Sequence, residues 1–211
     1  MTNIPSRPGK KTFLENLMLA ITVLGTLLTG LALLSYSILG FYSRYYADDY
    51  CMSGLVFQRG LWQAQIDQYM GWSNRFAGMW VLSLSELLGH SAIRAWTALV
   101  IILMVTALAW TILQFLRWLN LSLSMWLIVL LAELIVFFTI LFAPQLYQSL
   151  FWRIGIITYT LPLVILILLT GMVIRFSTRA PSEPVKVGAM VACAAVAFFA
   201  GGFSETYLVL Q

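Results

Sequence analysis

The chain has 211 residues, of which 61% are hydrophobic and only 9% are charged, and its formal net charge is +4. Ordinary soluble domains carry about 25% charged residues, so this composition excludes that class and indicates an integral membrane protein. The sequence contains no cluster of Lys and Arg with interleaved aromatic residues, which argues against a nucleic-acid partner.

Five apolar runs approach or exceed the roughly 20 residues that a helix needs to cross a bilayer. Each run is continuous rather than alternating, which favours helices over the strands of a barrel. In chain order they are Leu17–Phe41, Ala92–Leu116, Leu123–Ala143, Thr160–Ile174 (longer if Ile154–Tyr159 joins it) and Val187–Gln211. We therefore expect an all-α polytopic membrane protein with a single transmembrane domain over residues 1–211. Because the last run has no polar tail, we expect the N-terminal part of a longer protein.

The basic residues predict the orientation of the chain. They precede the first run or follow the second and fourth runs: Arg7, Lys10, Lys11, Arg117, Arg175, Arg179 and Lys186. Loops rich in Lys and Arg tend to remain in the cytoplasm, so we expect a cytoplasmic N-terminus in the cell inner (plasma) membrane. Loops 42–91 and 144–159 then face the extracytoplasmic side, where an active face would lie. Cys51 and Cys193 fall on opposite sides, too far apart for a disulfide.

The extracytoplasmic loop over residues 42–91 is expected to be helical rather than irregular. Its apolar residues recur at helical spacing: Trp62, Ile66, Tyr69, Phe76 and Trp80. This spacing predicts one or two amphipathic helices in the membrane interface between Gly54 and Leu88. The part from Phe76 to Leu88 is too short to span and is expected to form a second interfacial or re-entrant piece. Residues 144–162 are apolar but interrupted by prolines and a glycine, so we expect them to dip into the outer leaflet beside protein.

Two adjacent carboxylates, Asp48 and Asp49, follow the first apolar run. Acids are costly beside hydrocarbon unless something uses them. In one interpretation they are a catalytic pair: one is a general base, and the other orients it, binds a hydroxyl or holds a divalent cation. In the alternative they are a solvated turn that begins the interfacial helix. The two interpretations are compatible, because the start of a helix can also carry a catalytic acid.

Further charged residues are expected near the same face. Arg75 and Arg153 each either bind phosphate or sugar or anchor the chain at the lipid headgroups. Arg153 has the greater need of a charged partner, because the residues around it are apolar. Glu205 lies within the last apolar run, which makes it a functional candidate, or else the ion-pair partner of one of these arginines. Glu133, in the middle of the third run, is either a relay group or, more simply, a buried hydrogen-bonded acid.

Four motifs resemble those of the GT-C superfamily of polytopic membrane glycosyltransferases, and more closely those of a bacterial branch of it. They are Ala47–Cys51, Trp72–Phe76, Phe151–Gly155 with Tyr159 and Pro162, and Gly202–Thr206. The resemblance covers most of the chain but only the N-terminal half of a typical member. It implies that Asp48 or Asp49 is the catalytic base and that substrate is bound by Arg75, Arg153, Tyr159 and Glu205.

The implied reaction transfers a sugar, with inversion, from a polyprenyl-phosphate donor to an extracytoplasmic glycan or lipid acceptor. Arg75 or Arg153 would neutralise the leaving phosphate, and a divalent cation (Mg²⁺ or Mn²⁺) is compatible with this chemistry but not required. The partners would be the lipid-linked sugar, the glycan acceptor and membrane lipids. The rival hypotheses are a transporter or flippase that uses Glu133 and Glu205 inside the membrane, and a structural membrane protein without activity. Polar residues crowd the outer face, which favours the enzyme.

Overall fold

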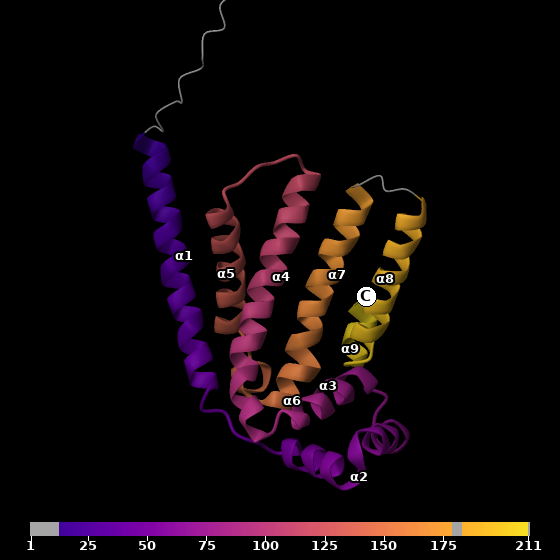
Figure 1. The fold of residues 1–211 in the computed structure, drawn as a ribbon. Helices are drawn as coiled ribbons and strands as arrows, with labels where there is room; N and C mark the ends of the chain where they lie inside the picture. The colour runs from indigo at the N-terminus through magenta and orange to yellow at the C-terminus, as the bar shows by residue number, and fades with distance from the viewer. Residues whose placement is uncertain (1–12, 179–182, 211) are drawn as a thin grey trace, which may run out of the picture.

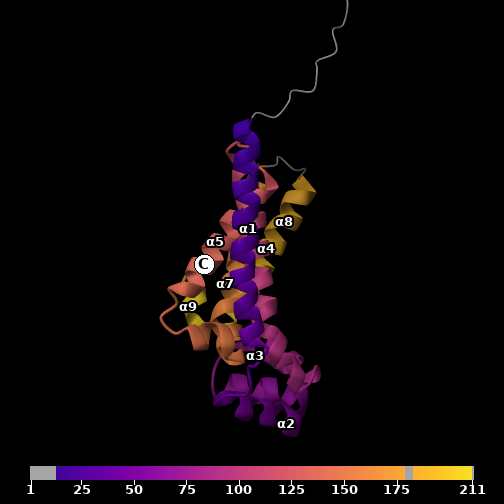
Figure 2. The same ribbon diagram turned by 90° about the vertical axis from the view of Figure 1, so that its left-hand side faces the viewer.

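The computed structural model describes residues 13–178 and 183–210, and these residues form helices and no strand. The long helices are α1 (Phe13–Gly40), α4 (Trp96–Trp118), α5 (Met125–Leu141), α7 (Leu161–Thr178) and α8 (Glu183–Gly201). They stand side by side in the order α1, α5, α4, α7, α8, each packed against the next (Figure 1). Figure 2 views this row from the side of α1, which stands in front of the other long helices.

The predicted class of helical membrane protein is confirmed. Four of the described segments are long and apolar enough to cross a membrane: Phe13–Gly40, Ser91–Trp118, Arg153–Thr178 and Pro184–Gly201. The fourth predicted run is therefore extended by Ile154–Tyr159. The third predicted run forms α5, which has 17 residues and a length of roughly 25 Å at 1.5 Å per residue. Ser124 caps its N-terminus, because the Ser124 hydroxyl accepts a hydrogen bond from the N–H of Leu127.

The last predicted run is not one continuous helix. The chain breaks at residues 202–204 and resumes as the short helix α9 (Glu205–Leu210). Contacts with α3 determine the position of this break. The carbonyl of Gly202 accepts a hydrogen bond from the N–H of Ala77 at 2.9 Å, and a Cβ on Gly202 would collide with the ring of Phe76. Glu205 therefore begins a helix at one end of the bundle instead of lying within a long span.

The helices predicted in the first loop are confirmed. α2 (Asp48–Gly71) and α3 (Phe76–Leu87) lie across one end of the row of long helices, and the 3₁₀ turn η1 (His90–Ala95) leads into α4 (Figure 1). The acidic pair does begin α2. Within α2 the chain bends at Gly60, where φ is 74°, a value that glycine adopts more readily than other residues.

The segment that precedes α7 returns to the same end of the bundle. It consists of η2 (Tyr147–Phe151), α6 (Arg153–Gly155) and η3 (Ile156–Thr160). Gly155 lies so close to the carbonyl of Gln148 that no Cβ fits between them. The hydroxyl of Thr97 in α4 donates a hydrogen bond to the carbonyl of Leu150 at 2.7 Å, which fixes the segment to the bundle.

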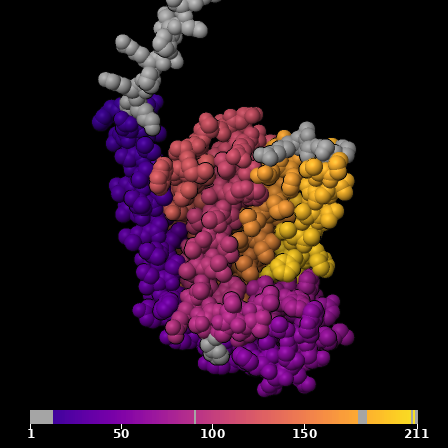
Figure 3. All heavy atoms as spheres, in the orientation of Figure 1, coloured from indigo at the N-terminus to yellow at the C-terminus, as the bar shows by residue number. Residues whose placement is uncertain are grey.

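Two buried apolar clusters hold these parts together. One lies among the long helices and includes Leu33, Val100, Met104, Val136, Ile156 and Val164. The other lies under α2 and α3 and comprises Val56, Ala64, Ala77, Met79, Leu82, Ile157 and Phe203. Figure 3 shows the atoms of α2 and α3 as a continuous layer at the lower end of the molecule. The second cluster therefore joins the first loop to the start of α7 and to the break after α8.

Candidate functional site

The two carboxylates of the acidic pair point in different directions. Asp48 is exposed and lines a pocket, whereas Asp49 is completely buried, with 0% exposure. Consecutive residues of a helix are about 100° apart around its axis, so one acid in the first turn of α2 can face the pocket while its neighbour faces the protein. The pair is thus divided into one accessible acid and one buried acid.

Arg153 is the partner of the buried acid. Its Nε donates to Oδ1 of Asp49 at 3.0 Å, its Nη1 donates to Oε1 of Glu86, and its Nη2 donates to the hydroxyl of Ser53 at 3.2 Å. The guanidinium is only 2% exposed, and its Cζ lies 4.6 Å from the ring centroid of Tyr45. We call these five residues the Arg153 cluster. The cluster connects the start of α2, the end of α3 and the segment before α7.

Glu86 is the second centre of the Arg153 cluster. Its Oε1 also accepts a hydrogen bond from the hydroxyl of Ser53 at 2.6 Å, and its Oε2 accepts one from the hydroxyl of Tyr45 at 2.7 Å. Burial by itself would raise the pKa of Glu86. The hydrogen bonds from Ser53, Tyr45 and Arg153, together with the positive charge of Arg153, outweigh that burial and lower the pKa. Glu86 is therefore held as the ionised carboxylate.

Asp49 behaves in the opposite way. Burial raises its pKa above the ordinary value, although the N–H of Tyr46, which donates to Oδ2 at 3.0 Å, and the charge of Arg153 act against the rise. The negative charge of Glu86 adds to the rise. One cation between two carboxylates leaves one negative charge in excess, and the better hydrogen-bonded Glu86 keeps the ionised form more strongly than burial allows for Asp49.

The backbone immediately before the pair is strained. Ala47 has φ 46° and ψ −115°, a conformation that residues other than glycine rarely adopt. Such a conformation persists only where surrounding contacts hold it. Here the peptide of Tyr46 is held on both sides, because its N–H donates to Asp49 and its carbonyl accepts a hydrogen bond from Nε1 of Trp152 at 3.1 Å.

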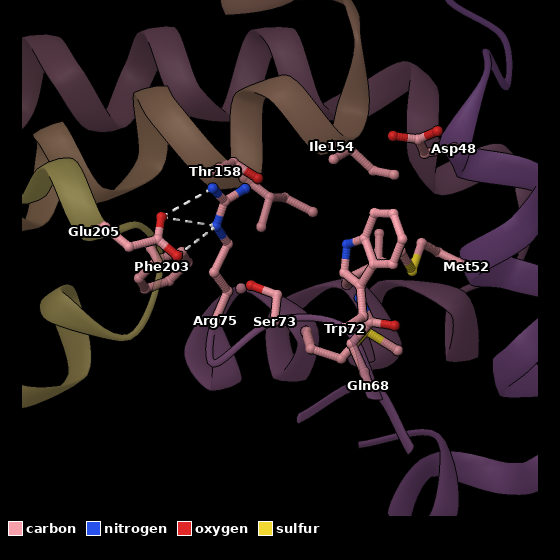
Figure 4. Close-up of a pocket in the computed structure, with 14 residues that line it drawn as sticks. Asp48, Met52, Gln68, Trp72, Ser73, Arg75, Ile154, Thr158, Phe203 and Glu205 are labelled. Carbon is pink, nitrogen blue, oxygen red and sulfur yellow. Dashed lines mark hydrogen bonds and ion pairs between the residues drawn. The ribbon is translucent and has the colours of Figure 1, made fainter. Parts of the chain in front are cut away.

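The pocket beside the cluster has a volume of about 410 Å³. It is lined by residues from α2, α3, the segment before α7 and the start of α9: Asp48, Met52, Gln68, Trp72, Ser73, Arg75, Gly78, Met79, Leu82, Ile154, Ile157, Thr158, Phe203 and Glu205. Asp48 lies at one end and Arg75 with Glu205 at the other, and the indole of Trp72 projects into the space between them (Figure 4). The pocket therefore separates an acid from an arginine–glutamate ion pair, and both polar and apolar side chains line the space between them.

Arg75 and Glu205 form an exposed ion pair. Nη2 of Arg75 lies 2.9 Å from Oε2 of Glu205, and Nε donates to the same oxygen at 3.2 Å. The hydrogen bonds from Arg75 lower the pKa of Glu205. The side chains are 42% and 56% exposed, so water competes for both. The predicted alternative of an ion pair with Arg75 is confirmed, and the partly exposed arginine lines the pocket together with its partner.

The remaining predicted residues lie elsewhere. Tyr159 is exposed, does not line this pocket, and uses its backbone carbonyl to accept a hydrogen bond from the hydroxyl of Tyr207. Glu133 is on α5, where its Oε2 is buried without a hydrogen-bond partner among the described residues, so the expected hydrogen-bonded acid is not found. The pocket thus brings together Asp48, Arg75 and Glu205, while Asp49 and Arg153 lie in the adjacent cluster.

Inspection of the sequence missed three members of the cluster: Tyr45, Ser53 and Glu86. A signal for Glu86 was present, because it is the only ionisable residue of the otherwise apolar helix α3. An isolated acid in such surroundings requires a cation. Tyr45 and Ser53 carry no comparable signal, since hydroxyl groups are common near helix starts.

Comparison with known proteins does not assign the chain to a family. The chain matches no protein family, no curated protein and no solved structure with which it was compared. Over residues 13–178 and 183–210, no group of three or more His, Cys, Asp or Glu side chains is placed to hold a metal ion. Cys51 and Cys193 are both free, in agreement with the prediction that they do not pair.

Proposed function

We propose that the protein is a membrane glycosyltransferase of the GT-C type that moves a sugar from a polyprenyl-phosphate donor to an extracytoplasmic glycan or lipid acceptor. The observation that carries this proposal is the pocket itself. It holds an accessible carboxylate, Asp48, at one end and an accessible arginine, Arg75, at the other. A transfer from a lipid phosphate needs a base for the acceptor and a cation for the leaving phosphate, and the apolar side chains of the lining suit the lipid.

The proposed reaction is a single displacement. Asp48 takes the proton of an acceptor hydroxyl while that oxygen attacks the anomeric carbon of the donor sugar. The bond from the anomeric carbon to the phosphate oxygen breaks, and polyprenyl phosphate leaves with the electron pair. Arg75 neutralises the phosphate charge through its N–H groups. Attack from the side opposite the phosphate inverts the configuration of the sugar.

Burial supports one choice among the residues that the sequence left as alternatives. Asp49 and Arg153 have 0% and 2% exposure and are engaged with each other, so neither is open to substrate. Asp48 and Arg75 both line the pocket and are accessible. We therefore assign the base to Asp48 and the phosphate contact to Arg75, with Glu205 beside it.

We further propose that the pocket end of the bundle faces the outside of the plasma membrane. The first loop, the segment before α7 and Glu205 share one end, and the loop between α4 and α5 lies at the other (Figure 1). Residues 1–12 and Arg179, which contribute to the charge bias, lie outside the described residues. In a Cys193→Ser background, Cys51, which is exposed on α2, should react with an impermeant maleimide on intact cells. Reaction only after permeabilisation would reverse the orientation.

The transporter hypothesis retains one supporting observation, the buried and unpartnered Oε2 of Glu133 within α5. A transport path would have to connect this carboxylate with the polar residues at the pocket end. The residues that line the Asp48 pocket do not include Glu133. The enzyme hypothesis uses the pocket as it stands and is the one that we favour.

The test is transfer from radiolabelled polyprenyl-phosphate glucose, mannose and galactose by membranes that contain the full-length protein. Asp48→Asn should fold normally and lower transfer about 10²–10⁴-fold, the usual contribution of a positioned base. Asp67→Asn is the matched control, because Asp67 is on the same helix and does not line the pocket. Transfer by Asp48→Asn at the wild-type rate would reject the proposed function.

A further inference from the structure

We propose that Glu86 is a positioning residue for Asp48, and that it acts through Arg153 and Asp49 to hold the strained Ala47 peptide that turns Asp48 into the pocket. The inference rests on the proposed function. It deepens that function by assigning a role to a residue that does not touch the substrate pocket.

A continuous series of contacts leads from Glu86 to the backbone beside Asp48. The carboxylate of Glu86 binds Nη1 of Arg153, and Nε of Arg153 binds Oδ1 of Asp49 at 3.0 Å. The other oxygen of Asp49 accepts the N–H of Tyr46 at 3.0 Å. The series therefore ends on the backbone N–H of Tyr46, the residue that precedes Ala47.

Asp48 depends on its backbone for its position. Its side chain makes no hydrogen bond or ion pair with any residue in the described ranges 13–178 and 183–210, so nothing but the first turn of α2 aims it. Rotation about φ of Ala47 toward an ordinary negative value would turn that first turn relative to the chain before it. The carboxylate would then leave the place from which it faces Arg75 across the pocket.

The strained backbone and the buried carboxylates are energetically unfavourable, which suggests that they serve to fix the position of Asp48. A relaxed turn with both acids in water would avoid the strain at Ala47 and the burial of Asp49 and Glu86 around a single cation. The chain instead has a positive φ at a residue with a Cβ and a completely buried carboxylate next to it. Strained backbone held by a buried polar network is typical of sites that must keep one geometry.

The experiment compares Glu86→Gln and Ala47→Gly with Glu133→Gln, a matched change of a half-buried acid that lies outside both the pocket and the cluster. Full-length proteins in proteoliposomes are assayed for kcat and for the donor KM with the three radiolabelled polyprenyl-phosphate hexoses, and melting temperatures are measured on the same preparations. Displacement of a reacting group by about 1 Å can cost about 100-fold in rate. We expect Glu86→Gln to lower kcat by about 10- to 100-fold, with little change in KM because Arg75 is untouched. Glu133→Gln should keep the wild-type kcat.

Ala47→Gly separates positioning from stability. Glycine adopts a positive φ without strain, so Ala47→Gly alone should keep the wild-type kcat. If the cluster acts by holding that φ, the double variant Glu86→Gln/Ala47→Gly should recover part of the kcat that Glu86→Gln loses, whereas a merely structural cluster would give no such recovery. If Glu86→Gln does not fold, Ser53→Ala and Tyr45→Phe, each of which removes one hydrogen bond to Glu86, replace it.

The outcomes distinguish the two proposals. If Asp48→Asn is inactive while folded Glu86→Gln keeps the wild-type kcat, or loses kcat that Ala47→Gly does not restore, the positioning role is wrong and the proposed function stands. If the wild type transfers none of the three sugars, or Asp48→Asn transfers at the wild-type rate, the proposed function falls and the positioning role falls with it.

Discussion

Arg153→Ala should cost about 3–5 kcal/mol of unfolding free energy, the usual cost of removing one partner from a buried ion pair. The change leaves the carboxylates of Asp49 and Glu86 buried without their cation. For chains of 150–250 residues about 1 kcal/mol corresponds to about 2–4 °C in the melting temperature, so the expected loss is roughly 6–20 °C. Arg153→Lys should recover part of it, because an ammonium supplies the charge but not the planar fork that reaches both acids.

The assay is thermal unfolding of the purified full-length protein in detergent, followed by tryptophan fluorescence. The control is Arg59→Ala, because Arg59 is an exposed residue 3.9 Å from Asp67 whose pair should contribute about 0–1 kcal/mol. Without the cation the two buried carboxylates are protonated more easily, so mild acid should restore part of the stability lost by Arg153→Ala. An Arg153→Ala protein that melts no lower than the Arg59→Ala control would refute the account of the Arg153 cluster.

Three further outcomes are expected. Arg75→Ala should change the free energy of unfolding by only about 0–1 kcal/mol, because its ion pair is exposed, but should raise the donor KM in the transfer assay. The folded-state pKa of Glu86 lies below its ordinary value of 4.5, so its stabilisation is present above that pH and is lost as the pH falls through the folded pKa. The melting-temperature difference between wild type and Glu86→Gln should therefore shrink in acid, and a difference that grows would contradict the assignment. Gly155→Ala should destabilise by about 1–3 kcal/mol or more through collision with the Gln148 carbonyl. Gly188→Ala meets open space within helix α8 and should be neutral or stabilising by up to about 1 kcal/mol in the same unfolding measurement.

The spans were predictable because their signal is local. A continuous apolar run must be helical in a bilayer whatever its neighbours are, so α1, α4 and α7 follow from the run lengths. The break after α8 does not follow in the same way. It depends on the contact of Gly202 with Phe76 and Ala77, which are distant in the chain. An apolar run that contains glycines has the same sequence pattern whether or not such a contact forms.

The sequence predicted which end of the bundle carries the candidate site, but not which charged residues pair with each other. Run lengths and basic loops place Asp48, Arg75 and Glu205 toward one end of the bundle, and they do line one pocket. The choice between Arg75 and Arg153 as the accessible cation depends on depth. Each follows a tryptophan within three residues and precedes an apolar residue, and only the tertiary packing of α6 against the start of α2 buries Arg153.

The Arg153 cluster is difficult to explain as a source of stability. Well-packed apolar side chains of similar volume often stabilise a fold as well as, or better than, a buried ion pair, because charges must be removed from water to form the pair. The end of the bundle already has an apolar cluster that joins α2, α3 and the segment before α7. A network with two carboxylates and one guanidinium instead fixes orientation, since its hydrogen bonds hold the side chain of Asp49 and the backbone N–H of Tyr46. Because Asp49 and Asp48 share one turn of helix, fixing the buried acid also fixes the accessible one.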